Sequence, residues 1–137
     1  MQDFIKQLAD APSEKRIQAI NERLKVLIAQ SESERIETLK GFVMSVSELP
    51  ESKKAQFISD RTLCISQLPT NQIATLMTSR ARLSSLIPRD VNEADMKQTF
   101  MAIKQWPEEK RNSLLHDIKH AYEIANVRFP EMEAAMS

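Results

Sequence analysis

Apolar side chains recur along the chain at the three- and four-residue spacing of amphipathic α-helices. Within residues 12–30 they occupy positions 17, 20, 24, 27 and 28, and within residues 107–125 they occupy positions 114, 115, 118, 122 and 125. This spacing gathers the apolar side chains on one face of a helix. The pattern predicts an all-α protein.

The helices are expected to repeat with a fixed period. An apolar residue followed by proline recurs every nineteen residues, at Leu49-Pro50, Leu68-Pro69, Ile87-Pro88 and Trp106-Pro107. Counting back by the same interval reaches Ser31 and then Pro12, and both residue types are common at helix starts. The chain from residue 12 to residue 125 therefore divides into six units of equal length.

Local signals refine the expected helix starts. Pro12 and Pro107 suit the first helical position, where a missing N–H costs nothing. Ser31 and Glu34 have the spacing of a capping box. In the fifth unit, a late start with Asp90 or Asn92 as the N-cap is expected.

The length of 137 residues predicts one domain over residues 1–137. Residues 2–11 resemble half a unit and are expected to cap the N-terminal end, and residues 126–137 should form a C-terminal cap or tail. Numbered from its first residue, each unit is apolar at position 9, and five of the six are apolar at position 16. These positions lie two turns apart and should face the core.

Two architectures fit the period. About 15 helical residues in each unit leave about four for a turn, so successive helices should be antiparallel neighbours. The predicted fold is six to seven short antiparallel helices, arranged either as a solenoid-like stack of helical hairpins or as an up-and-down bundle. The stack is favoured, because equal helices joined by equal turns suit a solenoid.

Composition narrows the function classes. Gly41 is the single glycine, so glycine-rich nucleotide loops are not expected, and its place inside a helix suggests close approach of a neighbouring helix or a kink. Nineteen basic residues balance nineteen acidic ones, which gives no argument for nucleic acid or a membrane surface. The chain has no long apolar run and one cysteine, Cys64, which indicate a soluble, cytoplasmic protein. No cofactor is expected.

Charge is nevertheless unevenly distributed. The window from Arg61 to Arg89 contains four arginines with no lysine and no acid, whereas residues 90–137 contain nine acids and six bases. The candidate partner-binding residues recur on one shoulder of the helices or lie in this window, namely Arg23, Lys54, Arg61, Arg80, Arg82 and Arg89. Either their stems cover the core and their charges pair with nearby carboxylates, or they form a groove for acidic partner segments or phosphates.

The favoured functional hypothesis is a non-enzymatic interaction module or adaptor that binds another protein through this arginine-rich shoulder. The basic middle could also bind the acidic C-terminal region of another copy. Nucleic-acid binding through phosphate contacts in the Arg61–Arg89 window is an alternative. It is disfavoured because no aromatic residue lies between positions 58 and 99 to stack on bases.

A metal-dependent hydrolase is a second alternative. His116 and His120 have the i, i+4 spacing of the HExxH zinc motif, but Asp117 replaces its glutamate. Together with Glu123 they are weak metal-ligand candidates, because helical periodicity places all three opposite Ile118 and away from the core. Cys64 is expected to be a buried, inert thiol.

Overall fold

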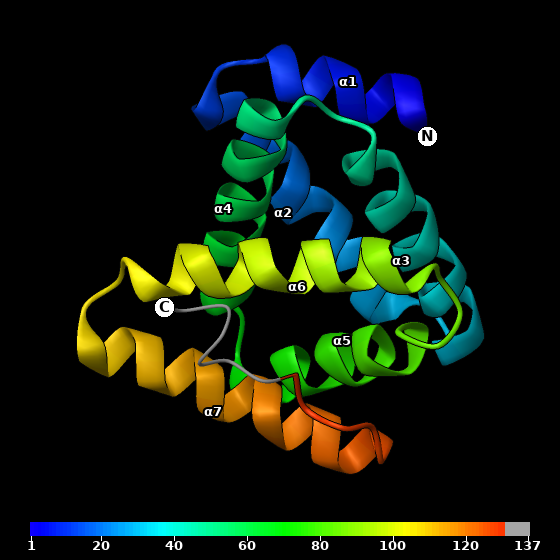
Figure 1. The fold of residues 1–137 in the computed structure, drawn as a ribbon, viewed down its shortest axis with the longest axis vertical. Coiled ribbons are helices and arrows are strands. Elements are labelled where there is room, and N and C mark those ends of the chain that lie inside the picture. Colours follow the sequence, from blue (N-terminus) through cyan, green and yellow to red (C-terminus); the bar gives the residue numbers. More distant parts are fainter. Residues whose placement is uncertain (131–137) are drawn as a thin grey trace.

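The computed structural model describes residues 1–130, which form seven α-helices and no strand (Figure 1). The helices are α1 (Gln2–Asp10), α2 (Ser13–Ala29), α3 (Glu32–Ser47), α4 (Glu51–Ser66), α5 (Thr70–Leu83), α6 (Arg89–Lys104) and α7 (Glu108–Ala125). From α2 to α7, each helix begins nineteen residues after the one before it. The predicted all-α fold and its period are thus confirmed. None of these helices is both long and apolar enough to cross a bilayer.

Proline occupies the residue before five of these helices and not the first helical position, where it was expected. It occupies the N-cap, with φ between −58° and −55°, at Pro12, Pro50, Pro69, Pro88 and Pro107. The N-cap suits proline because its carbonyl already accepts the first intrahelical hydrogen bond while its missing N–H is not needed. For the same reason the late start expected for the fifth unit is wrong: Pro88 accepts from the N–H of Asn92 at 3.0 Å, and α6 begins at Arg89.

The third helix begins with the predicted capping box. The N–H of Glu34 donates to Ser31 Oγ at 3.4 Å, and the N–H of Ser31 donates to Glu34 Oε1 at 3.3 Å. Two backbone donors that the helix itself leaves unpaired are satisfied in this way.

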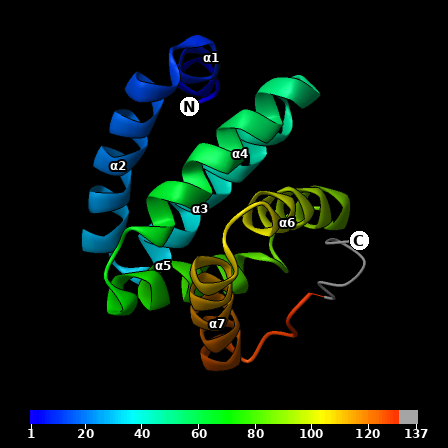
Figure 2. The same cartoon turned by 90° about the vertical axis from the view of Figure 1, so that its left-hand side faces the viewer.

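The helices form two rows. Each helix packs most extensively against its second neighbour, so that α1, α3, α5 and α7 make one row and α2, α4 and α6 the other. Consecutive helices contact each other less than second neighbours do, and third neighbours such as α3 and α6 meet across the rows. Because α1 and α7 lie at opposite ends of the molecule (Figures 1 and 2), the arrangement is a stack.

The core lies between the rows and follows the predicted positions. Position 9 of the units is buried at Ile20, Ile58, Met77 and Met96 and half-buried at Leu39 and Leu115. One apolar cluster joins α1 to α5 and a second joins α5 to α7, and both include Ile65 and Leu68 at their edges. The stack therefore has a continuous apolar interior.

Both ends of the stack carry a packed segment. At the C-terminal end, the ring of Phe129 lies 5.4 Å from that of Tyr122 and 5.8 Å from that of Phe100, measured between centroids. Residues 131–137, the rest of the predicted cap or tail, lie outside the described residues. At the other end, a Cβ added to Gly41 would meet only the side chain of Met1, at 3.6 Å, which is ordinary contact and not the close helix approach expected there.

A buried arginine at the start of α2 connects three helices. Its Nη1 donates to three carbonyls at the end of α1, while its Nε donates to a carboxylate on α4. The acceptors of Arg16 are the carbonyl oxygens of Leu8, Ala9 and Ala11, at 3.2, 3.1 and 3.1 Å, and Asp60 Oδ2 at 2.8 Å. A guanidinium can do this because it offers five donors in one plane.

One unit later, Arg35 makes the same connection between α2, α3 and α5. It donates to the carbonyls of Leu27, Ile28 and Gln30, at 2.9, 3.4 and 2.6 Å, and to Ser79 Oγ at 3.1 Å. Both arginines occupy position 5 of their unit, and both reach acceptors 8, 7 and 5 residues earlier and 44 residues later. The repeat thus carries a polar contact as well as an apolar pattern.

Replacing Arg35 with methionine should lower the free energy of unfolding by about 2 to 3 kcal/mol, because buried carbonyls lose a charged donor. Urea unfolding at neutral pH measures this. Arg111→Met is the matched control: it alters position 5 of the last unit, which has no helix two places further on within residues 1–130, and should change stability by less than about 0.5 kcal/mol. Equal losses in the two variants would show that the connection is not what stabilises the fold.

Candidate functional site

A mostly apolar cavity of about 80 Å³ lies between the rows and is lined by side chains from all seven helices. Leu8 of α1, Phe42 of α3 and Phe57 of α4 belong to its apolar wall. The volume well exceeds the about 10 to 15 Å³ that one water needs, and a cavity with apolar walls suits an apolar guest better than water. The polar residues on the wall are Arg23, Arg61, Thr62, Arg80, Asp95 and Thr99.

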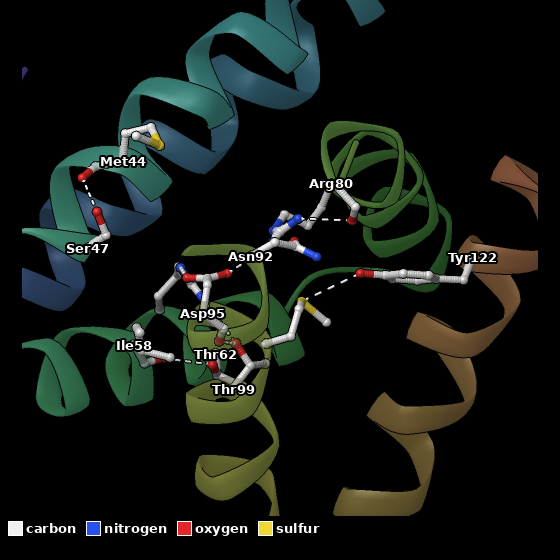
Figure 3. A network of polar contacts seen from close by, with 12 residues as sticks. Met44, Ser47, Ile58, Thr62, Arg80, Asn92, Asp95, Thr99 and Tyr122 are labelled. Carbon is white, nitrogen blue, oxygen red and sulfur yellow. Dashed lines mark hydrogen bonds and ion pairs between the residues drawn. The ribbon is translucent and has the colours of Figure 1, made fainter. Parts of the chain in front are cut away.

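Three of these polar residues form a buried ion cluster. Asp95 of α6 accepts from Arg61 Nη1 of α4 at 2.9 Å and from Arg80 Nη2 of α5 at 3.1 Å. Hydroxyl and amide groups complete the bonding, since Arg61 also donates to Thr99 Oγ1 at 2.9 Å and Arg80 to Asn92 Oδ1 at 2.7 Å. Figure 3 shows Asn92 and Asp95 close to Arg80.

The cluster carries one more positive charge than negative charge. Burial by itself raises the pKa of Asp95, but the charges of Arg61 and Arg80 and their hydrogen bonds outweigh it and hold this pKa below the ordinary value of an aspartate. Asp95 is therefore ionised at neutral pH, and two guanidinium groups share one carboxylate. The wall of the cavity consequently has a net positive charge.

The arginines predicted to bind a partner are largely paired within the chain. Besides Arg61 and Arg80, Arg82 pairs with Glu32, Arg89 Nε lies 2.8 Å from Glu93 Oε1, and Lys54 Nζ lies 3.2 Å from Glu51 Oε1. The window from Arg61 to Arg89 has no acid in sequence, but α3 and α6 bring acids to it in space. Pairing with nearby carboxylates is thus what the structure shows at these side chains.

Of the six predicted residues, the structure brings three to the cavity, Arg23, Arg61 and Arg80, and leaves Lys54, Arg82 and Arg89 away from its wall. Arg23 is exposed, and its guanidinium carbon lies 4.5 Å from the ring centroid of Phe4. All three share position 12 of their units. Their shared position in the repeat predicted that these three arginines lie on a common surface. No sequence feature predicted that Asp95 pairs with Arg61 and Arg80.

The side chains considered for catalysis do not meet at this site. His116, His120 and Glu123 are all exposed on α7, and the described part of the chain contains no group of three potential metal ligands. Burial and the nearby Asp60 carboxylate raise the pKa of Cys64 to about 11. Its thiol, 3.8 Å from the carbonyl oxygen of Ile17, is protonated at neutral pH.

Asp95→Asn should destabilise the protein by about 3 kcal/mol at pH 7, because the buried guanidinium of Arg80 and the partly exposed one of Arg61 lose their counter-charge. Since the pKa of Asp95 is lower in the folded state, its contribution is complete above the unfolded-state value of about 3.9 and is lost as pH falls through the folded-state pKa. The stability difference between wild type and variant should therefore shrink below about pH 4. Urea unfolding between neutral and acidic pH measures it.

The matched control is Glu93→Gln, on the same helix, whose partner Arg89 is 92% exposed in its side chain. This variant should be indistinguishable from wild type at neutral pH, because exposed ion pairs contribute little. A difference between wild type and Asp95→Asn that stays constant into acid would contradict the account of the cluster.

Comparisons of this chain with models of known protein families, with curated proteins and with solved structures found no match. Function must therefore be inferred from the chain's own side chains. Among these, a positively charged cluster lies on the wall of the apolar cavity.

Proposed function

We propose that the chain is a non-enzymatic helical-repeat module that binds a partner protein at the cavity between its rows. The observation that carries the proposal is the excess positive charge of the Arg61–Asp95–Arg80 cluster on an otherwise apolar wall. Binding sites of this kind combine apolar surface with a few fixed polar groups. A stack of short helices supports such a site because every helix contributes to the wall.

The chemistry of the wall defines the partner segment. An apolar side chain fills the cavity as the anchor, and a carboxylate beside it binds the guanidinium groups of Arg61 and the exposed Arg23. The side chain of Arg61 is 18% exposed, so a bound carboxylate reaches it without disrupting Asp95. Adding one negative charge neutralises the cluster, which favours an acidic segment over a neutral one.

The other hypotheses receive less support. In the window, phosphate groups would compete with Glu32 and Glu93, which already pair with Arg82 and Arg89. The exposed His116 and His120 lack the enclosed surroundings of a catalytic metal centre. Self-association and a cytoplasmic location remain predictions.

Charge reversal at Arg23 tests the proposed surface. Arg23→Glu removes a guanidinium at the cavity and should reduce capture of the partner from a native extract about tenfold, because a like charge then faces the acidic segment. Lys25→Glu makes the same change at an exposed residue of α2 that does not line the cavity, and should leave capture unchanged. Far-ultraviolet circular dichroism confirms that both variants are folded. Equal capture by wild type, Arg23→Glu and Lys25→Glu would rule out this surface.

A further inference from the structure

Position 5 of the repeat lacks a cation in two helices, α5 and α6, where it holds Ile73 and Asn92, and of these two only α5 is followed, within residues 1–130, by a helix two places further on. Position 5 holds Arg16 in α2, Arg35 in α3 and Lys54 in α4, and the side chain of Lys54 is 13% exposed. In α5 the same position holds Ile73, which is buried. All four of these helices are packed against the helix two places further on, so the surroundings of a buried cation recur at α5.

A hollow lies where that cation would be. It is lined by Ser66 at the end of α4, by Ile73 itself, and by the N-terminal half of α7, with Pro107, Glu109, Lys110, Ser113, Leu114 and Asp117. Arg35 donates to residues 27, 28, 30 and 79, which lie 8, 7 and 5 residues before it and 44 residues after it. The same offsets from Ile73 lead to residues 65, 66, 68 and 117, and these four positions are called the frame. Ser66 and Asp117 are two of these positions. The hollow thus overlaps the acceptor positions of the missing guanidinium at two of the four.

The end of α4 shares one backbone hydrogen bond with the helix ends around the resident arginines, although its C-cap, Gln67, is αR whereas Ala11 and Gln30, the C-caps of α1 and α2, are extended. The carbonyl of Ile65 accepts from the N–H of Leu68 at 3.1 Å, as the carbonyl of Leu27 accepts from the N–H of Gln30 at 3.2 Å. The Leu27 carbonyl still accepts a hydrogen bond from Arg35 at 2.9 Å, because a carbonyl oxygen has two lone pairs. The carbonyl of Ile65 can therefore accept a second hydrogen bond in the same way, and the helix dipole favours a cation there.

The charges around the hollow favour a cation as well. Asp117 stands where Asp60 stands in the site of Arg16, but its side chain has no ion pair or hydrogen bond with any residue between 1 and 130. Glu109 adds a second carboxylate. Lys110 is the one base on the wall, and its Nζ lies 4.7 Å from the centroid of the Trp106 ring. Two acids and one base leave the hollow with a net negative charge.

From these observations we infer that the hollow between Ser66, Ile73 and Asp117 is a socket for the guanidinium group of an arginine supplied by another protein molecule. The incoming group donates to the Asp117 carboxylate and to the carbonyls at the end of α4, as Arg16 does to Asp60 and to the end of α1. A planar guanidinium is favoured over an ammonium because it reaches both acceptor sets at once. The socket shares only Leu114 with the wall of the apolar cavity, so it is a second site.

Titration of the ¹⁵N-labelled chain with N-acetyl-arginine amide tests the socket. Saturable shifts of the backbone amide signals of Ser66, Ser113 and Asp117 are expected. The same titration with N-acetyl-citrulline amide, which has nearly the same shape but no charge, should give none. Asp117→Asn should weaken binding by about tenfold or more, since it removes a charged acceptor. Glu108→Gln is the control, because it removes an acid of α7 that does not line the socket.

A second variant supplies the missing side chain internally. Ile73→Arg should fill the socket, abolish the shifts and leave the thermal unfolding midpoint equal or higher. Arginine and citrulline amides giving the same shifts, or binding that survives Asp117→Asn, would overturn the proposal even if Ile73→Arg does not fold. Because this test uses the purified chain alone, its outcome is independent of partner capture at the apolar cavity.

Sedimentation velocity distinguishes the two sources of the arginine. Self-association that increases with protein concentration and is abolished by Asp117→Asn assigns it to a second copy. A monomer at all concentrations, together with binding of the arginine amide, assigns it to a different protein.

Discussion

The stack depends on buried guanidinium groups that satisfy the end of one helix and hold the helix two places further on. Each turn, of two to five residues, leaves carbonyl groups at the end of a helix without intrahelical partners, and burying them unpaired would cost about 1 to 3 kcal/mol each. Arg16 and Arg35 supply those partners from the first turn of the next helix. Each also donates to the neighbouring helix in its own row, Arg16 to Asp60 and Arg35 to Ser79. The contact that ends one helix therefore also sets how the second-next helix packs.

The same principle recurs between the rows and produces the candidate sites. Arg61 and Arg80, from consecutive helices, converge on Asp95, which fixes α4 and α5 against α6. Desolvation makes such clusters costly, so their main effect is to specify one packing arrangement, and here they also leave positive charge beside apolar surface. In α5, Ile73 replaces the position-5 cation, and a hollow lined by Ser66, Ile73 and Asp117 lies beside it. Both candidate sites thus arise from how this repeat handles buried charge.

The sequence predicted much of the fold because its strongest signals are local. The prolines from Pro50 to Pro107 and the capping box at Ser31 mark helix starts through backbone geometry within a few residues. The nineteen-residue period extended that information to the stack. The charge partners could not be predicted in this way, because Asp95 lies 34 residues from Arg61 and Glu32 lies 50 residues from Arg82. The frame around Ile73 was likewise hidden, since it becomes visible only when the offsets of Arg16 and Arg35 are known.

Hydrogen exchange of the arginine Nε–H groups measures whether buried guanidinium groups connect the helices. The Nε–H of Arg16 and of Arg35 donates to Asp60 and to the Leu27 carbonyl inside the protein, whereas that of Arg89 donates to Glu93 at the surface. The first two should exchange at least about a hundredfold more slowly than the third, because exchange requires the helices to separate. Exchange of Arg16 and Arg35 as fast as that of Arg89 would show that these guanidinium groups do not hold the helices together.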